Sequence, residues 1–206
     1  DALVVKSECF ESSYLENKGN GKFERRALPL ECQVAPIFGM LTGDYNNDGH
    51  TDILITGNSY STEVSTGAYD AMTGILLAGD GRGNFKSLVS NTTGFKADGD
   101  SKGMALLHTA VNANIILSAN NDGDLKTYSF SNNNMASATA GKNDVYALIQ
   151  NKNGKTYKQE FYWGNSYLSN SSRVFNYNSS LVSFVIFYDN KGNKKQVTPN
   201  SKQKEK

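Results

Sequence analysis

Residue types that support particular functions are scarce in this sequence of 206 residues. It contains only two histidines, two cysteines, one tryptophan and three prolines. Two cysteines do not make the framework of a disulfide-rich domain, and two histidines argue against a His-based triad or a zinc site. Lysine and arginine total 21 against 20 acidic residues, so the chain lacks the basic excess that is typical of nucleic-acid-binding proteins.

Long apolar runs are absent as well. No run approaches the roughly 18 residues that a helix needs to cross a bilayer, so we expect no transmembrane segment. The chain opens on Asp1 with neither an initiator methionine nor a secretion signal. We therefore expect it to be processed or to be cut from a longer protein.

The abundant residues favour strands and turns. The sequence holds 24 Asn, 19 Gly, 11 Tyr and 10 Phe. Asn and Gly favour turns, whereas Tyr and Phe favour strands, and helical periodicity is hard to find. The composition predicts an all-β fold of many short strands joined by tight turns.

Nine strands are predicted in the first two thirds of the chain. Two pairs of these strands are joined by the same motif, Gly-x-Gly-x-Phe. It occurs at Gly19–Phe23 and again at Gly81–Phe85. Phe23 and Phe85 are 62 residues apart, which is compatible with a repeated β unit that carries a polar insert at 58–74. The predicted strands cover residues 12–16, 22–25, 37–42, 53–57, 75–78, 85–88, 101–107, 114–119 and 125–128.

The composition changes at residues 131–138, which we predict to be a linker. Beyond it two hairpins are expected, formed by strands at 145–150, 156–163, 181–188 and 194–197. The charged C-terminus has no apolar residue and is expected to be frayed. The predicted units are therefore 1–133, a small β domain at 138–199 and a disordered tail at 200–206.

Cys9 and Cys32 lie on either side of the first predicted hairpin. The hairpin brings its ends together, so the two thiols either form a bridge or remain as two buried free thiols.

One loop has the spacing of metal ligands. Its side-chain oxygens stand at positions 1, 3, 5 and 9 between two apolar strands, and calcium prefers six to eight oxygens. The pattern predicts a Ca²⁺ site that holds the strands together. Its proposed ligands are Asp44, Asn46, Asp48, His50 and Asp52.

His50 stands at position 7 and would offer its backbone carbonyl, while Gly49 at position 6 permits the sharp turn. Position 12 is Ile55, where an EF-hand needs a bidentate glutamate, so the loop is not an EF-hand. The alternative is a turn rich in Asx residues that binds no cation.

Other candidates are weaker. Asp80–Asn84 is predicted to be a plain hairpin turn, and Trp163 is expected to be a core residue, although an exposed aromatic row would suit a sugar. Lys102 and Arg82 are the basic residues that a calcium-dependent lyase would need. Four loop acids could form a second weak cation site: Asp98, Asp100, Asp122 and Asp124.

The segments 44–57 and 77–85 resemble an FG-GAP/VCBS repeat, the calcium-loop blade of integrin-α-like β-propellers. The resemblance implies cation ligands at Asp44, Asn46, Asp48 and Asp52. The run Gly164–Arg173 resembles the ASPIC/UnbV domain, which follows such propellers in surface proteins of Bacteroidetes type and in cartilage acidic proteins. Asn170 departs from that family's pattern, where Gln is common.

The resemblance implies partial β-propeller blades, that is, antiparallel four-stranded sheets, followed by a small β domain. A propeller needs at least four blades, so we expect the remaining blades or a partner chain. The implied protein is extracytoplasmic, at the cell surface or secreted. We expect a non-enzymatic, calcium-stabilised adhesion or binding module for a glycan or protein ligand. The alternatives are part of a calcium-dependent carbohydrate-active enzyme, similar to a polysaccharide lyase, and a purely structural segment of a surface assembly.

Overall fold

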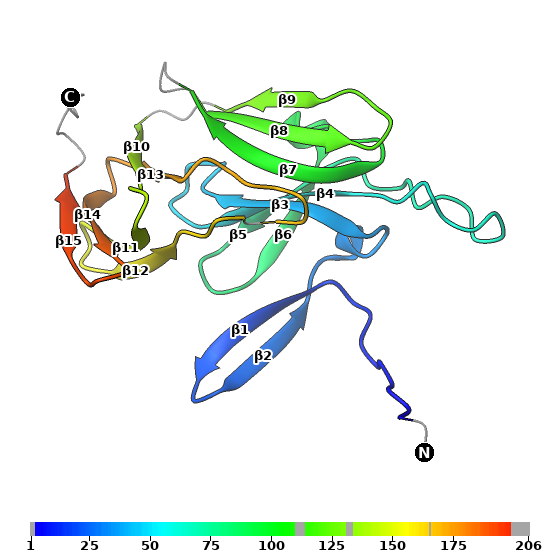
Figure 1. The fold of residues 1–206 in the computed structure, drawn as a ribbon, viewed down its shortest axis with the longest axis horizontal. Helices are drawn as coiled ribbons and strands as arrows, with labels where there is room; N and C mark the ends of the chain where they lie inside the picture. Colours follow the sequence, from blue (N-terminus) through cyan, green and yellow to red (C-terminus); the bar gives the residue numbers. More distant parts are fainter. Residues whose placement is uncertain (1–2, 110–113, 131–133, 165, 199–206) are drawn as a thin grey trace.

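The computed structural model describes residues 3–109, 114–130, 134–164 and 166–198, and within them the protein is nearly all β (Figure 1). Its strands form antiparallel sheets of two to four strands. The helical elements of the described residues are short, a 3-10 turn at Leu30–Cys32 and helix α1 at Ser90–Thr93. The predicted all-β fold of small antiparallel sheets is confirmed, while the predicted tail at 200–206 lies outside the described residues.

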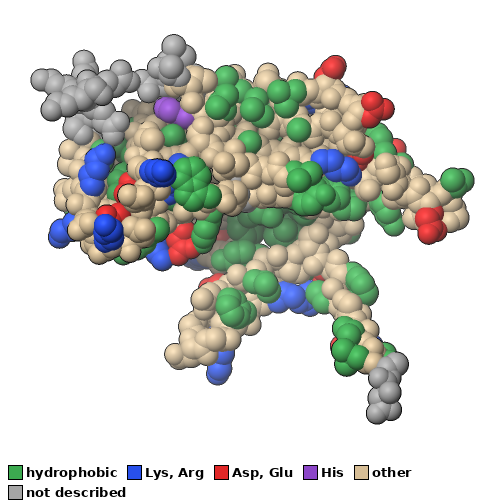
Figure 2. Space-filling model, viewed as in Figure 1, with side chains coloured by type: hydrophobic (Ala, Val, Ile, Leu, Met, Phe, Trp, Pro, Cys, Tyr) green, Lys and Arg blue, Asp and Glu red, His purple; other side chains and the backbone are tan. Residues whose placement is uncertain are grey.

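The first two strands, β1 (Ser13–Gly19) and β2 (Lys22–Ala27), form the predicted hairpin. Gly19 and Gly21 in its turn have φ angles of +81° and +71°, which residues with a side chain rarely adopt. The hairpin and the extended segment that precedes it project from the body as two prongs (Figures 1 and 2).

The next four strands form one sheet in sequence order, as consecutive antiparallel hairpins do. Both faces of this sheet are covered. Leu41, Leu54 and Leu76 pack in one buried cluster, and Ile55 and Leu77 pack in another on the opposite face. The strands are β3 (Ile37–Gly43), β4 (Asp52–Gly57), β5 (Ile75–Gly79) and β6 (Phe85–Val89). Strands β4 and β5 are almost continuously apolar, as expected for strands buried on both sides, whereas β3 and β6 also have exposed positions.

A three-stranded sheet packs on the first of these faces. Its strands are β7 (Ser101–His108), β8 (Asn114–Asn120) and β9 (Lys126–Ser129). Met104 and Ile116 complete the cluster of Leu41 and Leu54. The backbone of β3 comes close to β7 at Gly39, where an added Cβ would lie 2.8 Å from the Cβ of Met104. Gly39 therefore lets the first strands of the two sheets approach each other.

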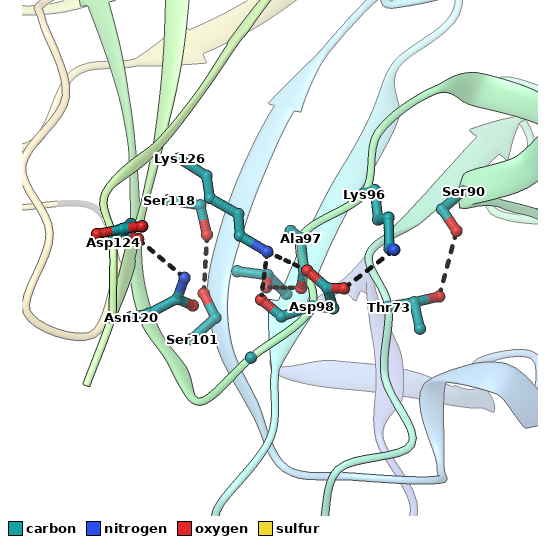
Figure 3. Close-up of polar contacts among 12 residues, drawn as sticks. Thr73, Ser90, Lys96, Ala97, Asp98, Ser101, Ser118, Asn120, Asp124 and Lys126 are labelled. Atoms are coloured by element: carbon teal, nitrogen blue, oxygen red, sulfur yellow. Dashed lines mark hydrogen bonds and ion pairs between the residues drawn. The ribbon is translucent and has the colours of Figure 1, made fainter. Parts of the chain in front are cut away.

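Ion pairs fix the connection between these two sheets (Figure 3). Asp98 pairs with Lys126 of β9 and, at 3.3 Å, with Lys96. The buried hydroxyls of Ser101 and Ser118 lie 2.9 Å apart across β7 and β8. Asp98 therefore has two cationic partners of its own, and the prediction of a second cation site at this position loses its support.

The C-terminal part is built from six strands in two sheets. The four-stranded sheet has the order β12-β11-β14-β15 and contains the two predicted hairpins, which are confirmed. The smaller sheet pairs β10 with β13, and β10 covers the second half of the predicted linker. The strands are β10 (Met135–Thr139), β11 (Asp144–Asn151), β12 (Thr156–Glu160), β13 (Val174–Asn178), β14 (Val182–Asp189) and β15 (Lys194–Val197).

The segment between β12 and β13 protects an open sheet edge. Strand β7 lies at the edge of its sheet, and an open edge exposes backbone groups to other strands. Serine hydroxyls of the segment accept hydrogen bonds from alternate amides of β7. The pairs are Met104 N to Ser169 Oγ at 3.0 Å, Leu106 N to Ser171 Oγ at 2.9 Å and His108 N to Ser172 Oγ at 3.0 Å.

Both cysteines are free thiols. Cys32 is buried, and burial raises the pKa of its thiol to about 11. Cys9 is exposed on the extended segment before β1. The bridged alternative is therefore not formed, and the alternative of two buried thiols holds only for Cys32.

Candidate metal centre

The acidic loop connects β3 to β4, the two first strands of the four-stranded sheet. It turns sharply through Asn47 and Gly49, whose φ angles are +65° and +85°. Gly49 thus supplies the left-handed conformation that was predicted for position 6.

The side chains of the loop fold back onto its own backbone. Asp44 Oδ1 accepts from the amide of Asp48 at 3.1 Å, and its Oδ2 accepts from the amide of Gly49 at 3.0 Å. Asn46 and Asp48 each accept from the amide two residues further on, at 2.9 and 2.8 Å. These bonds hold the loop in a tight turn and keep its oxygens on the loop instead of splaying them away from it.

Asp52 is the residue that joins this loop to the rest of the sheet. Its side chain is fully buried. Oδ2 accepts from the amides of Tyr45 and Asn46, at 3.0 and 3.2 Å, and Oδ1 accepts from the amide of Gly79 at 3.0 Å. One carboxylate therefore fastens the β3–β4 loop and the end of β5 to the start of β4.

Burial raises the pKa of both Asp44 and Asp52 above the ordinary value. Hydrogen bonds from backbone amides oppose this shift at each residue, and the neighbouring acid Asp48 adds to it. Burial therefore disfavours the charged carboxylates, and a bound cation would reduce this cost.

His50 lies with its ring against the neighbouring turn. A Cβ added to Gly81 would lie 2.5 Å from Nδ1 of His50, and Gly81 has a φ angle of +70°. The ring packs on the β5–β6 turn, and the role of the His50 backbone carbonyl as a ligand stays a prediction.

In their chemistry, the five predicted donors fit a hard cation. Each is an oxygen, from three carboxylates, one amide and one backbone carbonyl, as calcium prefers. Among the described residues, however, no three His, Cys, Asp or Glu side chains form a group that could hold a metal ion. The oxygens of Asp52 already accept three amide hydrogen bonds, so the calcium assignment stays a prediction.

The loop also contacts the C-terminal part of the chain. Asn178 Nδ2 donates to Asn47 Oδ1 at 2.9 Å, and Gly49 lies close to the side chain of Leu181. A small pocket between them is lined by Asp44, Asn47, Met135, Asn176, Tyr177 and Asn178. The sequence motif did not reveal this contact, because Asn178 is 131 residues away from its partner.

Lys102 and Arg82 lie apart from each other. Lys102 forms an ion pair with Asp100 at 2.6 Å and lies 4.2 Å from the ring centre of Phe38, near the start of β3. The acidic loop begins at the other end of β3, about 20 Å away at the usual rise of a strand. Arg82 is on the turn beside the loop. The two basic residues suggested for a lyase are therefore not brought together.

Three further sequence predictions have clear outcomes. Asp80 accepts from the amides of Arg82 and Asn84, as a plain hairpin turn requires. Asp100 is paired with Lys102, and no group of three such acids that could hold a metal ion is found among the described residues. Trp163 is 67% exposed, and the expectation that it belongs to the core is wrong because β12 ends at Glu160, before the alternation reaches it.

No family model and no curated protein matches the chain. No helix among the described residues is long and apolar enough to cross a bilayer.

Replacing Asp52 with alanine should destabilise the protein even without metal. Three amides, one buried and two partly buried, lose their acceptor, and at about 1 kcal/mol each the free energy of unfolding should fall by about 3 kcal/mol. Asp48→Ala breaks exposed bonds only and should cost less than about 1 kcal/mol. Urea denaturation in EDTA measures both, and equal losses would show that Asp52 does not anchor the loop.

The pair of Lys102 and Asp100 gives a prediction about pH. Burial alone raises the pKa of Asp100, but hydrogen bonds from Lys102 and Asn121 outweigh it and lower the pKa below 3.8. The pair therefore stabilises the folded state above pH 3.8, and this stabilisation is lost as the pH falls through the lowered pKa.

Lys102→Met leaves the buried carboxylate without its cationic partner and should cost about 3 kcal/mol at pH 7. Denaturation at several pH values should show the deficit shrinking below about pH 4, as Asp100 becomes protonated in both proteins. A deficit that stays constant down to pH 3 would contradict the role of this ion pair.

Proposed function

We propose that the protein is a calcium-stabilised, non-enzymatic binding module that works outside the cytoplasm and recognises a glycan or a protein. The observation that supports this proposal most is the acidic loop, in which oxygens from four side chains are held in one turn. The resemblance to FG-GAP/VCBS repeats and to the ASPIC/UnbV domain suggests the location.

In this proposal the bound cation is structural. Asp44, Asn46, Asp48, Asp52 and the carbonyl of His50 would hold it, and its charge would offset the clustered carboxylates. The loop joins two strands and also contacts the C-terminal part through Asn178, so binding would stiffen the contact between the two.

Exposed aromatic side chains supply a recognition surface. The segment between β12 and β13, which lies along β7, carries three exposed aromatic residues, Tyr162, Trp163 and Tyr167. The guanidinium of Arg173 lies 4.4 Å from the ring centre of Trp163 and orients that ring. Aromatic rings with one free face are suited to sugars and to protein partners, because they combine apolar area with little entropy loss.

The enzyme alternative has less support. A lyase needs a base beside the cation, and Lys102 lies at the far end of β3 in an ion pair with Asp100. Arg82 lies on the turn beside the loop, but a guanidinium stays protonated and is a poor base. A purely structural segment of a surface assembly is the second candidate. The two projecting prongs, which are the β1–β2 hairpin and the extended segment before it, favour this candidate (Figure 2).

Calorimetric titration with CaCl₂ tests the cation site. We expect saturable heat with the wild type and at least tenfold weaker binding with Asp48→Ala. Asp189→Ala is a matched control, since Asp189 accepts amide hydrogen bonds in a similar exposed turn, and it should bind like the wild type. No heat from the wild type, or equal heat from Asp48→Ala, would contradict the site.

Trp163 is the only tryptophan, so its fluorescence reports on the proposed recognition surface. A glycan array selects the oligosaccharide, and titration with it should change the emission. Trp163→Ala carries no tryptophan, so its binding is measured by calorimetry; it should weaken binding about tenfold, or about 1.4 kcal/mol, and leave the melting temperature unchanged. Tyr69→Ala, which removes an exposed aromatic ring elsewhere, is the control, and equal losses in both variants would contradict this surface.

A further inference from the structure

Two hairpins of the chain have the same register. Adding 62 to each residue number of the β1–β2 pairing gives the β5–β6 pairing. This holds for five successive pairs, from Ser13 with Ala27 and Ile75 with Val89 to Asn17 with Phe23 and Gly79 with Phe85. The first hairpin is therefore a structural copy of the outer half of the four-stranded sheet.

Each copy contacts the sheet that comes next in the sequence, but at different strands. Leu76 of β5 lies in the cluster that contains Met104 of β7. Its counterpart in the first hairpin is Tyr14, whose ring lies 5.4 Å from that of Phe85 in β6. Leu76 therefore packs in a buried core, whereas Tyr14 contacts the edge strand of the next sheet.

The copies differ in what lies beside their first strand. β5 is paired on its inner side with β4, whereas β1 pairs only with β2 among the described residues. Leu77 is fully buried, but its counterpart Leu15 is 60% exposed. An isolated pair of strands is marginally stable in water, and this one carries apolar side chains that nothing in the described chain covers.

The segment before β1 shows the same contrast. Phe10 is the counterpart of Met72, which is 1% exposed, and Phe10 itself is 86% exposed. Met72 is held by two hydrogen bonds to the side chain of Asn58, the residue that follows β4. A residue equivalent to Asn58 would hold Phe10 in the same way. That residue would follow a strand beside β1, which the described chain does not have.

We infer that the open edge of β1 binds a polypeptide hairpin of the β3–β4 type, made of an apolar strand, an acidic turn and a second apolar strand. The pairing of β4 with β5 fixes the register. Residues equivalent to Ile53, Leu54 and Ile55 lie opposite Leu15, Tyr14 and Ser13.

A second copy of this chain does not supply the hairpin, because its own β3 and β4 are already paired within their sheet. The occupant is therefore a further segment of this type, and the hairpin it joins becomes a four-stranded sheet like β3–β6. This inference rests on register and burial, and it does not depend on calcium.

The test places such a hairpin in the correct position. A copy of residues 37–62 fused directly before Asp1 reproduces the spacing of 62 residues. Hydrogen exchange of the amides in β1, followed by mass spectrometry in EDTA, should slow at least tenfold relative to the unfused protein. The control fusion carries Leu54→Pro in the copy, which removes an amide and disrupts the strand. Unchanged exchange, or equal slowing in the control, would overturn the inference.

A second measurement covers the case in which the fusion does not fold. The peptide 37–62 with Ile53→Cys is added to the full chain with Leu15→Cys and Cys9→Ser. Residues 53 and 15 are opposite each other in the inferred register, so a disulfide should form several-fold faster than with the Thr56→Cys peptide. Equal rates with the two peptides would overturn the register and the inference.

Discussion

The buried carboxylate of Asp52 is the interaction on which the four-stranded sheet depends. Its oxygens accept hydrogen bonds from Tyr45, Asn46 and Gly79, and so it fixes a loop and a neighbouring strand end to β4. A buried charge is costly unless it is fully hydrogen-bonded. The three amides offset that cost and place the acidic loop in one orientation relative to the sheet.

This arrangement connects the fold to the proposed cation. The same carboxylate that anchors β4 belongs to the set of oxygens that would bind calcium, and burial raises its pKa. The loop reaches the C-terminal part through the contact of Asn47 with Asn178. A cation at this place would therefore act on both parts of the chain, which fits a structural role better than a catalytic one.

Much of the fold could be predicted from the sequence. Apolar runs such as Ile53–Gly57 predicted the strands, and the glycines of the first hairpin predicted its turn, because these are local signals. Strands β10 and β13 were missed because their pairing joins residues about 40 positions apart. The serine hydroxyls along β7 left only a weak signal, the two-residue spacing of Ser169 and Ser171. The exposure of Trp163 follows from where β12 ends, which its aromatic pattern did not reveal.

The most direct test of the account is the exchange of three backbone amides in calcium-free protein, measured by NMR. Tyr45 and Asn46 lie in a loop, where amides ordinarily exchange fast, and Gly79 ends a strand. If Asp52 anchors the sheet, all three amides exchange slowly and at similar rates, close to those of the buried strand β4. Exchange of Tyr45 and Asn46 at the rate of an exposed loop would contradict the account.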